Sequence, residues 1–153
     1  MVQRDNTPNQ ISSSGGNKLL LRSQKRASEV LSKIKAEAEQ FTPDDVAFLK
    51  GLPSMIMQNG LGQVIAFMVV KSKDKENEKS AGSKSKKNYA KINKILCELV
   101  GLGSDPVKGL ENIIQESDLA RYRRYQQEAI EYAAWMKKFA IAFAKEDRKE
   151  KGS

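Results

Sequence analysis

The chain has 153 residues and a formal net charge of +8, and it contains no histidine and one cysteine, Cys97. Its length suits one folded domain. A hydrophobic fraction of 39% with 30% charged residues fits a folded domain with polar tails better than a disordered chain. Without histidine the commonest general base is missing, and a single cysteine allows neither an intramolecular disulfide nor a cysteine-based zinc site. We therefore expect no enzyme, no metal and no cofactor.

The N-terminal residues 1–18 are rich in serine, glycine, asparagine and glutamine, and we expect a mobile tail there. They lack the apolar segment of a signal peptide. The longest apolar run, residues 61–70, is too short to span a bilayer. We expect a cytoplasmic protein with no membrane partner.

A helical period begins at residue 19 and continues to residue 40. Its apolar stripe includes Leu31, Ile34 and Ala38. The opposite face carries four cations, Arg22, Lys25, Arg26 and Lys33. Thr42 and Pro43, followed by an acid three residues after the threonine, predict the start of a second helix. Gly51 and Pro53 predict its end.

Residues 54–70 are the most apolar part of the chain, and local preferences there conflict. Val64, Ile65 and Val69 suit a strand, whereas the methionines, alanine and phenylalanine suit a helix. The length favours a buried helix, although Gly60 and Gly62 weaken it. Residues 71–87 are rich in lysine and serine and predict a flexible loop.

A helix is predicted to resume at Asn88 and to end near Gly101, and a short helix follows over residues 104–117. Asp118 opens the last and longest helix, which has a broad apolar face and cations on its outer side. The sequence thus predicts an all-α fold: a compact single-domain bundle of about five to six helices over residues 19–147, with a disordered lysine-rich loop. Residues 148–153 are a charged tail, which could include residues left from cloning.

The last helix begins with three arginines, Arg121, Arg123 and Arg124, interleaved with tyrosines. Cations near a helix N-terminus oppose the helix dipole, so they are not placed there for helix stability. One interpretation is a solvated face, and the other is contact with phosphates, for which arginine is a bidentate donor. Elsewhere the carboxylates are scattered among lysines. The chain has two Gly-Leu-Gly segments, at residues 60–62 and 101–103, and neither completes a phosphate-binding loop.

Two stretches resemble the small-subunit family of Cmr-type (type III-B) CRISPR effector complexes. The first runs from Leu52-Pro53 through Asn59-Gly60-Leu61-Gly62-Gln63 to Ala66-Phe67. The second runs from Tyr122-Arg123 through Glu128-Ala129 to Trp135-Met136-Lys137-Lys138-Phe139-Ala140. They occur in the family's order, and with the flanking helices the resemblance covers roughly residues 19–144. Met136 and Lys138 stand where the family has leucine and arginine, and both changes are conservative.

The resemblance implies a helical fold for residues 54–70 and a subunit without catalytic activity. Copies of such a subunit stack along the guide RNA–target RNA duplex and contact its backbone. The implied partners are the guide RNA, the target RNA, other subunits of the effector complex and copies of the same chain. The match to the family's basic positions nominates Arg123, Lys137 and Lys138 as nucleic-acid-binding residues. Helical geometry adds Arg121, Arg124, Arg22, Lys25, Arg26 and Lys33, and Lys71 is added at the edge of the loop.

Other classes of function remain open on the sequence alone. One is a helical protein–protein interaction module, or a general nucleic-acid-binding protein, whose basic charge is incidental. Another is a sequence-specific DNA-binding protein, which we rank low because no clear helix-turn-helix is present and the helix over residues 104–117 lacks arginine.

Overall fold

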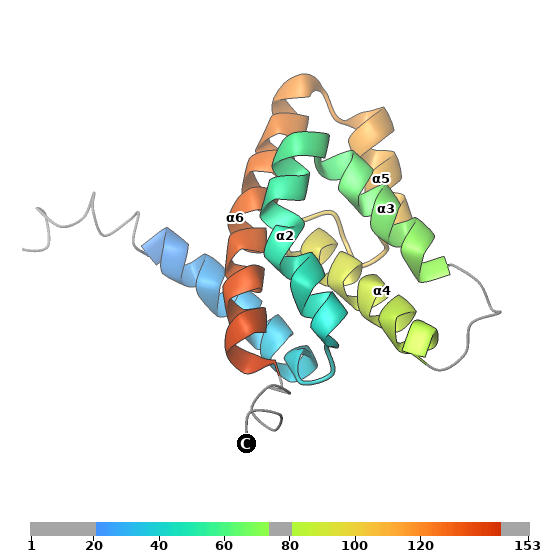
Figure 1. Ribbon diagram of the computed structural model, residues 1–153. Helices are drawn as coiled ribbons and strands as arrows, with labels where there is room; N and C mark the ends of the chain where they lie inside the picture. The colour runs from blue at the N-terminus through green and yellow to red at the C-terminus, as the bar shows by residue number, and fades with distance from the viewer. Residues whose placement is uncertain (1–20, 74–80, 145–153) are drawn as a thin grey trace, which may run out of the picture.

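The computed structural model describes residues 21–73 and 81–144 (Figure 1). The predicted tails, residues 1–18 and 148–153, lie outside this range, as do residues 74–80 of the predicted loop. Every regular element among the described residues is helical, which confirms the all-α prediction. None of these helices is long and apolar enough to cross a membrane.

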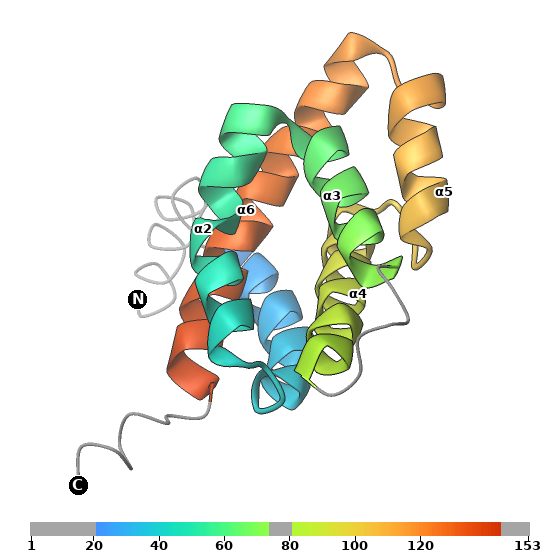
Figure 2. The ribbon, with the colours of Figure 1, turned by 45° about the vertical axis from the view of Figure 1, so that its right-hand side comes forward.

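The chain forms an N-terminal helix over residues 21–38, followed by shorter and longer helices that pack around one core. The later elements are α2 (Pro43–Asn59), α3 (Leu61–Lys73), α4 (Ala81–Val100), α5 (Pro106–Glu111), the π-helical turn η1 (Asn112–Glu116) and α6 (Leu119–Phe143). Helix α6 lies beside α2 over most of its length, and α3 packs mainly against α4. Figure 2 shows α2 and α3 diverging from a common turn, with α5 on the far side of α3.

The start of α2 follows the sequence prediction, but its end does not. The Thr42 hydroxyl accepts a hydrogen bond from the Asp45 N–H (3.1 Å), and the Asp45 carboxylate accepts one from the Thr42 N–H (2.8 Å). This reciprocal pair is a capping box. The helix then continues through Gly51 and Pro53 to Asn59, so the predicted stop is wrong.

Burial explains why an internal proline is tolerated in α2. A proline inside a helix costs about 3 kcal/mol because it removes a hydrogen bond and crowds the preceding turn. Leu49, Leu52 and Ile56 on the same helix are all fully buried. Each such side chain contributes about 1.5–3 kcal/mol of hydrophobic stabilisation, so their burial exceeds the cost of the proline.

The apolar segment over residues 54–70 is helical, as the resemblance implied, but it belongs to two helices. Gly60 separates α2 from α3, with a backbone φ of 92° and ψ of 148°. Helix α3 then continues to Lys73, and α4 begins at Ala81 rather than at Asn88. Both ends of the predicted loop, residues 71–73 and 81–87, are therefore helical.

The core draws fully buried side chains from the N-terminal helix and from α2, α3, α4 and α6. They include Ile34, Leu52, Ile65, Leu96 and Met136. Cys97 is also fully buried, and its thiol lies 3.9 Å from the Asn93 Oδ1 that it faces. Burial raises the pKa of this thiol to about 12. Cys97 therefore acts as a packing residue.

Candidate nucleic-acid interface

The turn between α2 and α3 is held by side chains of α6. Gly60 has no side chain to cap the start of α3, so two backbone N–H groups need partners from elsewhere. The Leu61 N–H donates to Gln126 Oε1 (3.0 Å), and the Gly62 N–H donates to the Tyr122 hydroxyl oxygen (3.1 Å). The two stretches that carried the family resemblance thus meet at this turn, where their glycines, tyrosine and glutamine have a structural role.

This contact sets the relative position of α2 and α6, which run antiparallel. Lys50 lies 11 residues before Leu61, and Lys137 lies 11 residues after Gln126, which is the hydrogen-bond partner of Leu61. Because both helices rise about 1.5 Å per residue, the two lysines lie at the same level along the pair. Lys50 is exposed and Lys137 is half-buried.

Two further cations lie on the outer side of α6 near this line. Winding at about 3.6 residues per turn places Arg123 towards the exposed edge of α2 and Lys138 on the outermost side of α6. Both are exposed, and the Lys138 Nζ lies 5.3 Å from the centre of the Trp135 ring. We call the surface formed by Lys50, Arg123, Lys137 and Lys138 the α2–α6 face.

The carboxylates of Glu128 and Glu131 on α6 reach towards the N-terminal helix, where they bind Arg26. The Arg26 guanidinium donates to both carboxylate oxygens of Glu128 (2.8 and 3.2 Å) and lies 3.7 Å from Glu131. Its side chain is only 15% exposed. The hydrogen bond to Glu128 is the main reason that the pKa of Arg26 is raised. The α2–α6 face therefore keeps its positive charge, whereas Arg26 is neutralised.

A second ion pair uses Lys33 of the N-terminal helix. Its Nζ lies 3.0 Å from Glu98 Oε1 on α4, and the other carboxylate oxygen accepts a hydrogen bond from the Ser104 hydroxyl (2.9 Å). The hydrogen bond from Lys33 is the main cause of the lowered pKa of Glu98. Arg26 and Lys33 thus form interhelical ion pairs in this structure, although the helical pattern alone placed them on an outer face.

The remaining nominated cations lie on several surfaces. Arg22 and Lys25 are exposed on the N-terminal helix. Arg121 lies at the first turn of α6, where its backbone N–H donates to the carboxylate of the capping residue Asp118 (2.8 Å). The helical winding places Arg121 on the flank of α6 away from Arg123.

Arg124 is exposed between those two flanks of α6. Lys71 belongs to α3, where its Nζ lies 5.8 Å from the Phe67 ring centre. The structure therefore places Lys137 and Lys138 next to each other on α6, with Arg123 about 21 Å away along the same helix, and it does not gather the ten nominated residues into one surface.

Lys50 is the member of the α2–α6 face that the sequence did not nominate. No local signal identifies it, because its neighbourhood depends on the antiparallel packing of α2 against α6. The predicted helix end at Gly51 also concealed the fact that Lys50 lies in the middle of a helix.

We expect Arg26→Ala to lower the free energy of unfolding by about 1–2 kcal/mol, because Glu128 would lose a half-buried bidentate partner. We expect RNA affinity to change less than twofold. Urea unfolding and an RNA-binding titration measure the two effects. Arg22→Ala, at an exposed position on the same helix, is the control and should change stability by less than about 0.5 kcal/mol. A loss of RNA affinity without a loss of stability would contradict the structural role.

The chemistry available to the α2–α6 face is electrostatic contact with a polyanion. Within residues 21–73 and 81–144 no group of three or more potential metal-ligating side chains is present. Exposed lysine and arginine side chains favour phosphate oxygens, and binding releases counterions from the nucleic acid.

Comparison with known proteins gave one match. A family model described as CRISPR-associated protein (Cas_Cmr5) matches residues 22–143. Searches of the curated proteins and of the solved structures found no match. The matched range covers every helix described above, from the N-terminal helix to the end of α6.

Proposed function

The chain belongs to the Cas_Cmr5 family of type III-B CRISPR-associated proteins, and we propose that it acts as the small subunit of a Cmr effector complex in the following way. In this proposal it has no catalytic activity and works in the cytoplasm. Copies of the chain stack beside other subunits along the guide RNA–target RNA duplex, and each copy contacts the RNA backbone through its α2–α6 face.

The observation that carries the proposal is the separation of charge on α6. Glu128 and Glu131 point to the N-terminal helix and bind Arg26. Arg123, Lys137 and Lys138 take no part in that ion pair, and Lys137 and Lys138 are level with Lys50, whereas Arg123 lies about 21 Å closer to the start of α6. Cations that lie on two packed helices can contact several phosphates at once.

The same surface suits recognition of the RNA backbone and not of base sequence. Three of its four members are lysines, which act as point charges towards phosphate and present no fixed hydrogen-bonding pattern. The major groove of an A-form duplex is too deep and narrow for side chains to read. We therefore assign the α2–α6 face to the phosphates of the duplex. Arg124 extends this contact along α6, whereas Arg22, Lys25 and Arg121 lie on the other flank and would meet phosphates separately.

The test is binding of the purified chain to a fluorescent guide–target RNA duplex across a salt series. We expect Arg123→Ala/Lys137→Ala/Lys138→Ala to bind about 10-fold to 100-fold more weakly at low salt. Its salt slope should fall by about two to three, because each lost phosphate contact removes about one released counterion. The loss should be equal for duplexes of unrelated sequence.

The matched control replaces three exposed cations elsewhere, Lys35→Ala/Lys94→Ala/Lys108→Ala, and so lowers the net charge equally. We expect this variant to retain most of the affinity. An equal loss in both variants would show that total charge, and not the α2–α6 face, governs binding. Absence of binding by the unaltered chain at low salt would instead favour an interaction module whose charge is incidental.

A further inference from the structure

Helix α2 ends in an asparagine that is followed by a glycine, and this pair has a chemistry of its own. Asn59-Gly60 is the only Asn-Gly step in the 153-residue sequence. The carbonyl carbon of an asparagine side chain lies within reach of the next backbone nitrogen, which most residue types shield with their Cβ atom. Glycine has no Cβ atom and allows more backbone rotation. Among thermolabile asparagines, one before glycine is therefore the most prone to lose its side-chain amide.

The reaction needs only hydroxide and water. The backbone nitrogen of Gly60 gives its proton to hydroxide and attacks Cγ, the side-chain carbonyl carbon of Asn59. A bond forms between this nitrogen and Cγ, and the bond from Cγ to Nδ2 breaks. Nδ2 leaves as ammonia with a proton taken from water, which regenerates the hydroxide. Water then opens the resulting cyclic succinimide at either carbonyl carbon, so that aspartate or isoaspartate remains at position 59.

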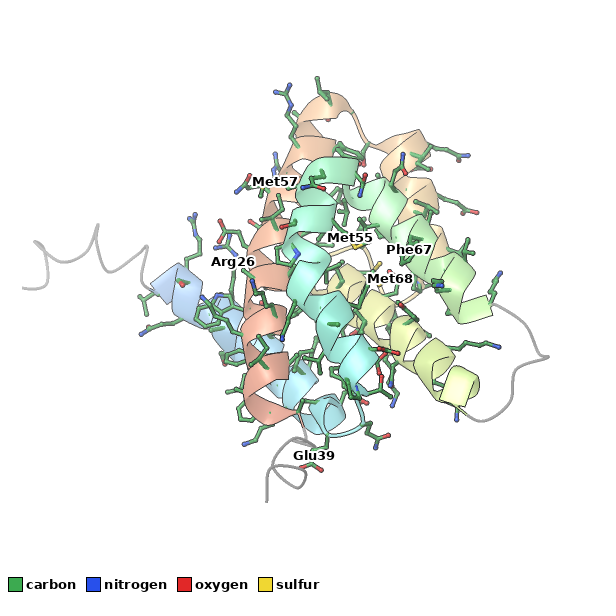
Figure 3. All side chains as sticks on the ribbon, viewed as in Figure 1. Arg26, Glu39, Met55, Met57, Phe67 and Met68 are labelled. Atoms are coloured by element: carbon green, nitrogen blue, oxygen red, sulfur yellow. The ribbon has the colours of Figure 1, made fainter. Side chains whose placement is uncertain are left out.

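Solvent reaches this end of α2 freely. Met57, in the last turn of the helix, is 61% exposed (Figure 3). Gln58 and Asn59 are exposed as well. Exclusion of water or hydroxide therefore does not protect Asn59, and any protection must come from the backbone.

The folded backbone opposes the attack in two ways. Asn59 is the last residue of α2, and the ψ angle of a helix holds the following nitrogen out of the plane in which the ring closes. In addition, the Gly60 N–H donates to the carbonyl oxygen of Ile56 (2.8 Å). Hydroxide can remove that proton only after the hydrogen bond has opened, as in amide hydrogen exchange.

Helix α6 holds the same turn in place. Gln126 Oε1 accepts a hydrogen bond from the Leu61 N–H (3.0 Å), and the Tyr122 hydroxyl oxygen accepts one from the Gly62 N–H (3.1 Å). A Cβ atom at position 60 would lie 3.0 Å from the Tyr122 hydroxyl oxygen, so the Gly60 backbone lies directly against α6. Rotation of the preceding peptide unit into the reactive geometry displaces Gly60 and therefore requires release of these contacts.

We propose that Asn59 is a site of spontaneous deamidation that the turn between α2 and α3 keeps closed, so that aspartate and isoaspartate form there only when the turn opens. Both products then disfavour closure. Aspartate adds a negative charge to the last turn of α2, which has no basic residue and where the helix dipole favours cations. Isoaspartate lengthens the backbone by a CH₂ group and displaces the Gly60 N–H from the Ile56 carbonyl. This chemistry belongs to the turn and does not depend on RNA binding.

Peptide mapping by mass spectrometry measures the reaction in the full chain during incubation in mildly alkaline buffer, and chromatographic retention separates aspartate from isoaspartate. In guanidinium chloride, where the chain is unfolded, we expect Asn59 to react before any other asparagine. In the folded chain we expect Asn59 to react at least about 10-fold more slowly, because the reactive backbone geometry is populated only in the open turn.

Gln126→Ala tests the contribution of α6. Loss of one hydrogen bond at the turn should make Asn59 react about 5-fold faster in the folded chain. Gln127→Ala, at the adjacent exposed position, is the matched control and should leave the rate unchanged. Tyr132→Phe removes the hydrogen bond to Glu29 Oε1 (2.8 Å) and so weakens the fold away from the turn. It should change the rate by less than about twofold, because the turn opens without global unfolding.

Equal rates at Asn59 in the folded and the unfolded chain would overturn the proposal, because the turn would then give no protection. Faster reaction at another asparagine of the unfolded chain would also contradict it. Equal acceleration by Gln126→Ala and Tyr132→Phe would place the reaction in the globally unfolded chain and not in the open turn. An unchanged rate in Gln126→Ala would show that α6 does not keep the turn closed.

Discussion

Gly60→Ala is expected to lower the free energy of unfolding by about 3 kcal/mol. The backbone there has φ 92° and ψ 148°, a region that residues with a Cβ atom adopt only with strain of about 1–3 kcal/mol. An added Cβ would also lie 3.0 Å from the Tyr122 hydroxyl oxygen, which accepts the hydrogen bond from the Gly62 N–H. Relief of that contact would pull the tyrosine away from the start of α3. Urea unfolding followed by circular dichroism measures the loss.

Gly101→Ala provides the matched control for this prediction. Gly101 also has φ 92°, but an added Cβ would meet no atom within 4 Å. It should therefore show only the backbone cost, about 1 kcal/mol. The double variant Gly60→Ala/Tyr122→Phe lacks the obstructing hydroxyl. Its loss of unfolding free energy should therefore be smaller than the sum of the losses in the two single variants. Equal destabilisation by Gly60→Ala and Gly101→Ala would mean that the contact with Tyr122 has no energetic role.

Asp45→Ala is also expected to cost about 3 kcal/mol. This carboxylate is 2% exposed, and one of its oxygens accepts hydrogen bonds from the Thr42 N–H (2.8 Å) and from the Asn88 side-chain amide. Asn88 is equally buried, and its amide also donates to the Gln40 carbonyl oxygen (3.2 Å). Removal of the carboxylate deletes half of the capping box and leaves a buried amide with one partner fewer. Thermal and urea unfolding both report the change.

Asp44→Ala is the control, because Asp44 occupies the same first turn of α2 but is exposed. It should lose only its favourable interaction with the helix dipole, which is about 0.5 kcal/mol. Asp45→Asn retains the shape of the side chain and one oxygen acceptor. Its loss of unfolding free energy should therefore lie between those of Asp44→Ala and Asp45→Ala. If Asp45→Ala were no more damaging than Asp44→Ala, the buried hydrogen bonds would not hold α2 against α4.

Helix starts marked by a capping side chain were predicted correctly, whereas the end expected at Pro53 and the start expected at Asn88 were wrong. The starts at Thr42 and Asp118 depend on a capping side chain and the residues within one turn of it, and both lie where the pattern placed them. The end expected at Pro53 depends on whether burial of Leu52 and Ile56 exceeds the local cost of proline. That balance is set by helices distant in the sequence, so a local pattern cannot decide it.

In the candidate site, too, features set by local sequence were predicted and features set by distant helices were not. The helical wheel of the last helix correctly placed Arg123 and Lys138 on its outer side, because this depends on periodicity alone. Arg26 and Lys33 were assigned to an exposed face, yet their carboxylate partners belong to α6 and α4 and become neighbours only in the folded chain. Lys50 was missed for the same reason. Charge composition could therefore indicate a polyanionic partner, but not the surface that meets it.

The most direct test of the α2–α6 face is photo-crosslinking within the assembled effector complex. A photoreactive amino acid is placed at the position of Lys50, and in a second version at the exposed position of Lys94 on α4, and the crosslinked species are identified after irradiation. We expect the Lys50 position to crosslink to guide or target RNA and the Lys94 position to give no RNA adduct. RNA adducts from the Lys94 position, with only protein adducts from the Lys50 position, would contradict the assignment of the α2–α6 face to the duplex.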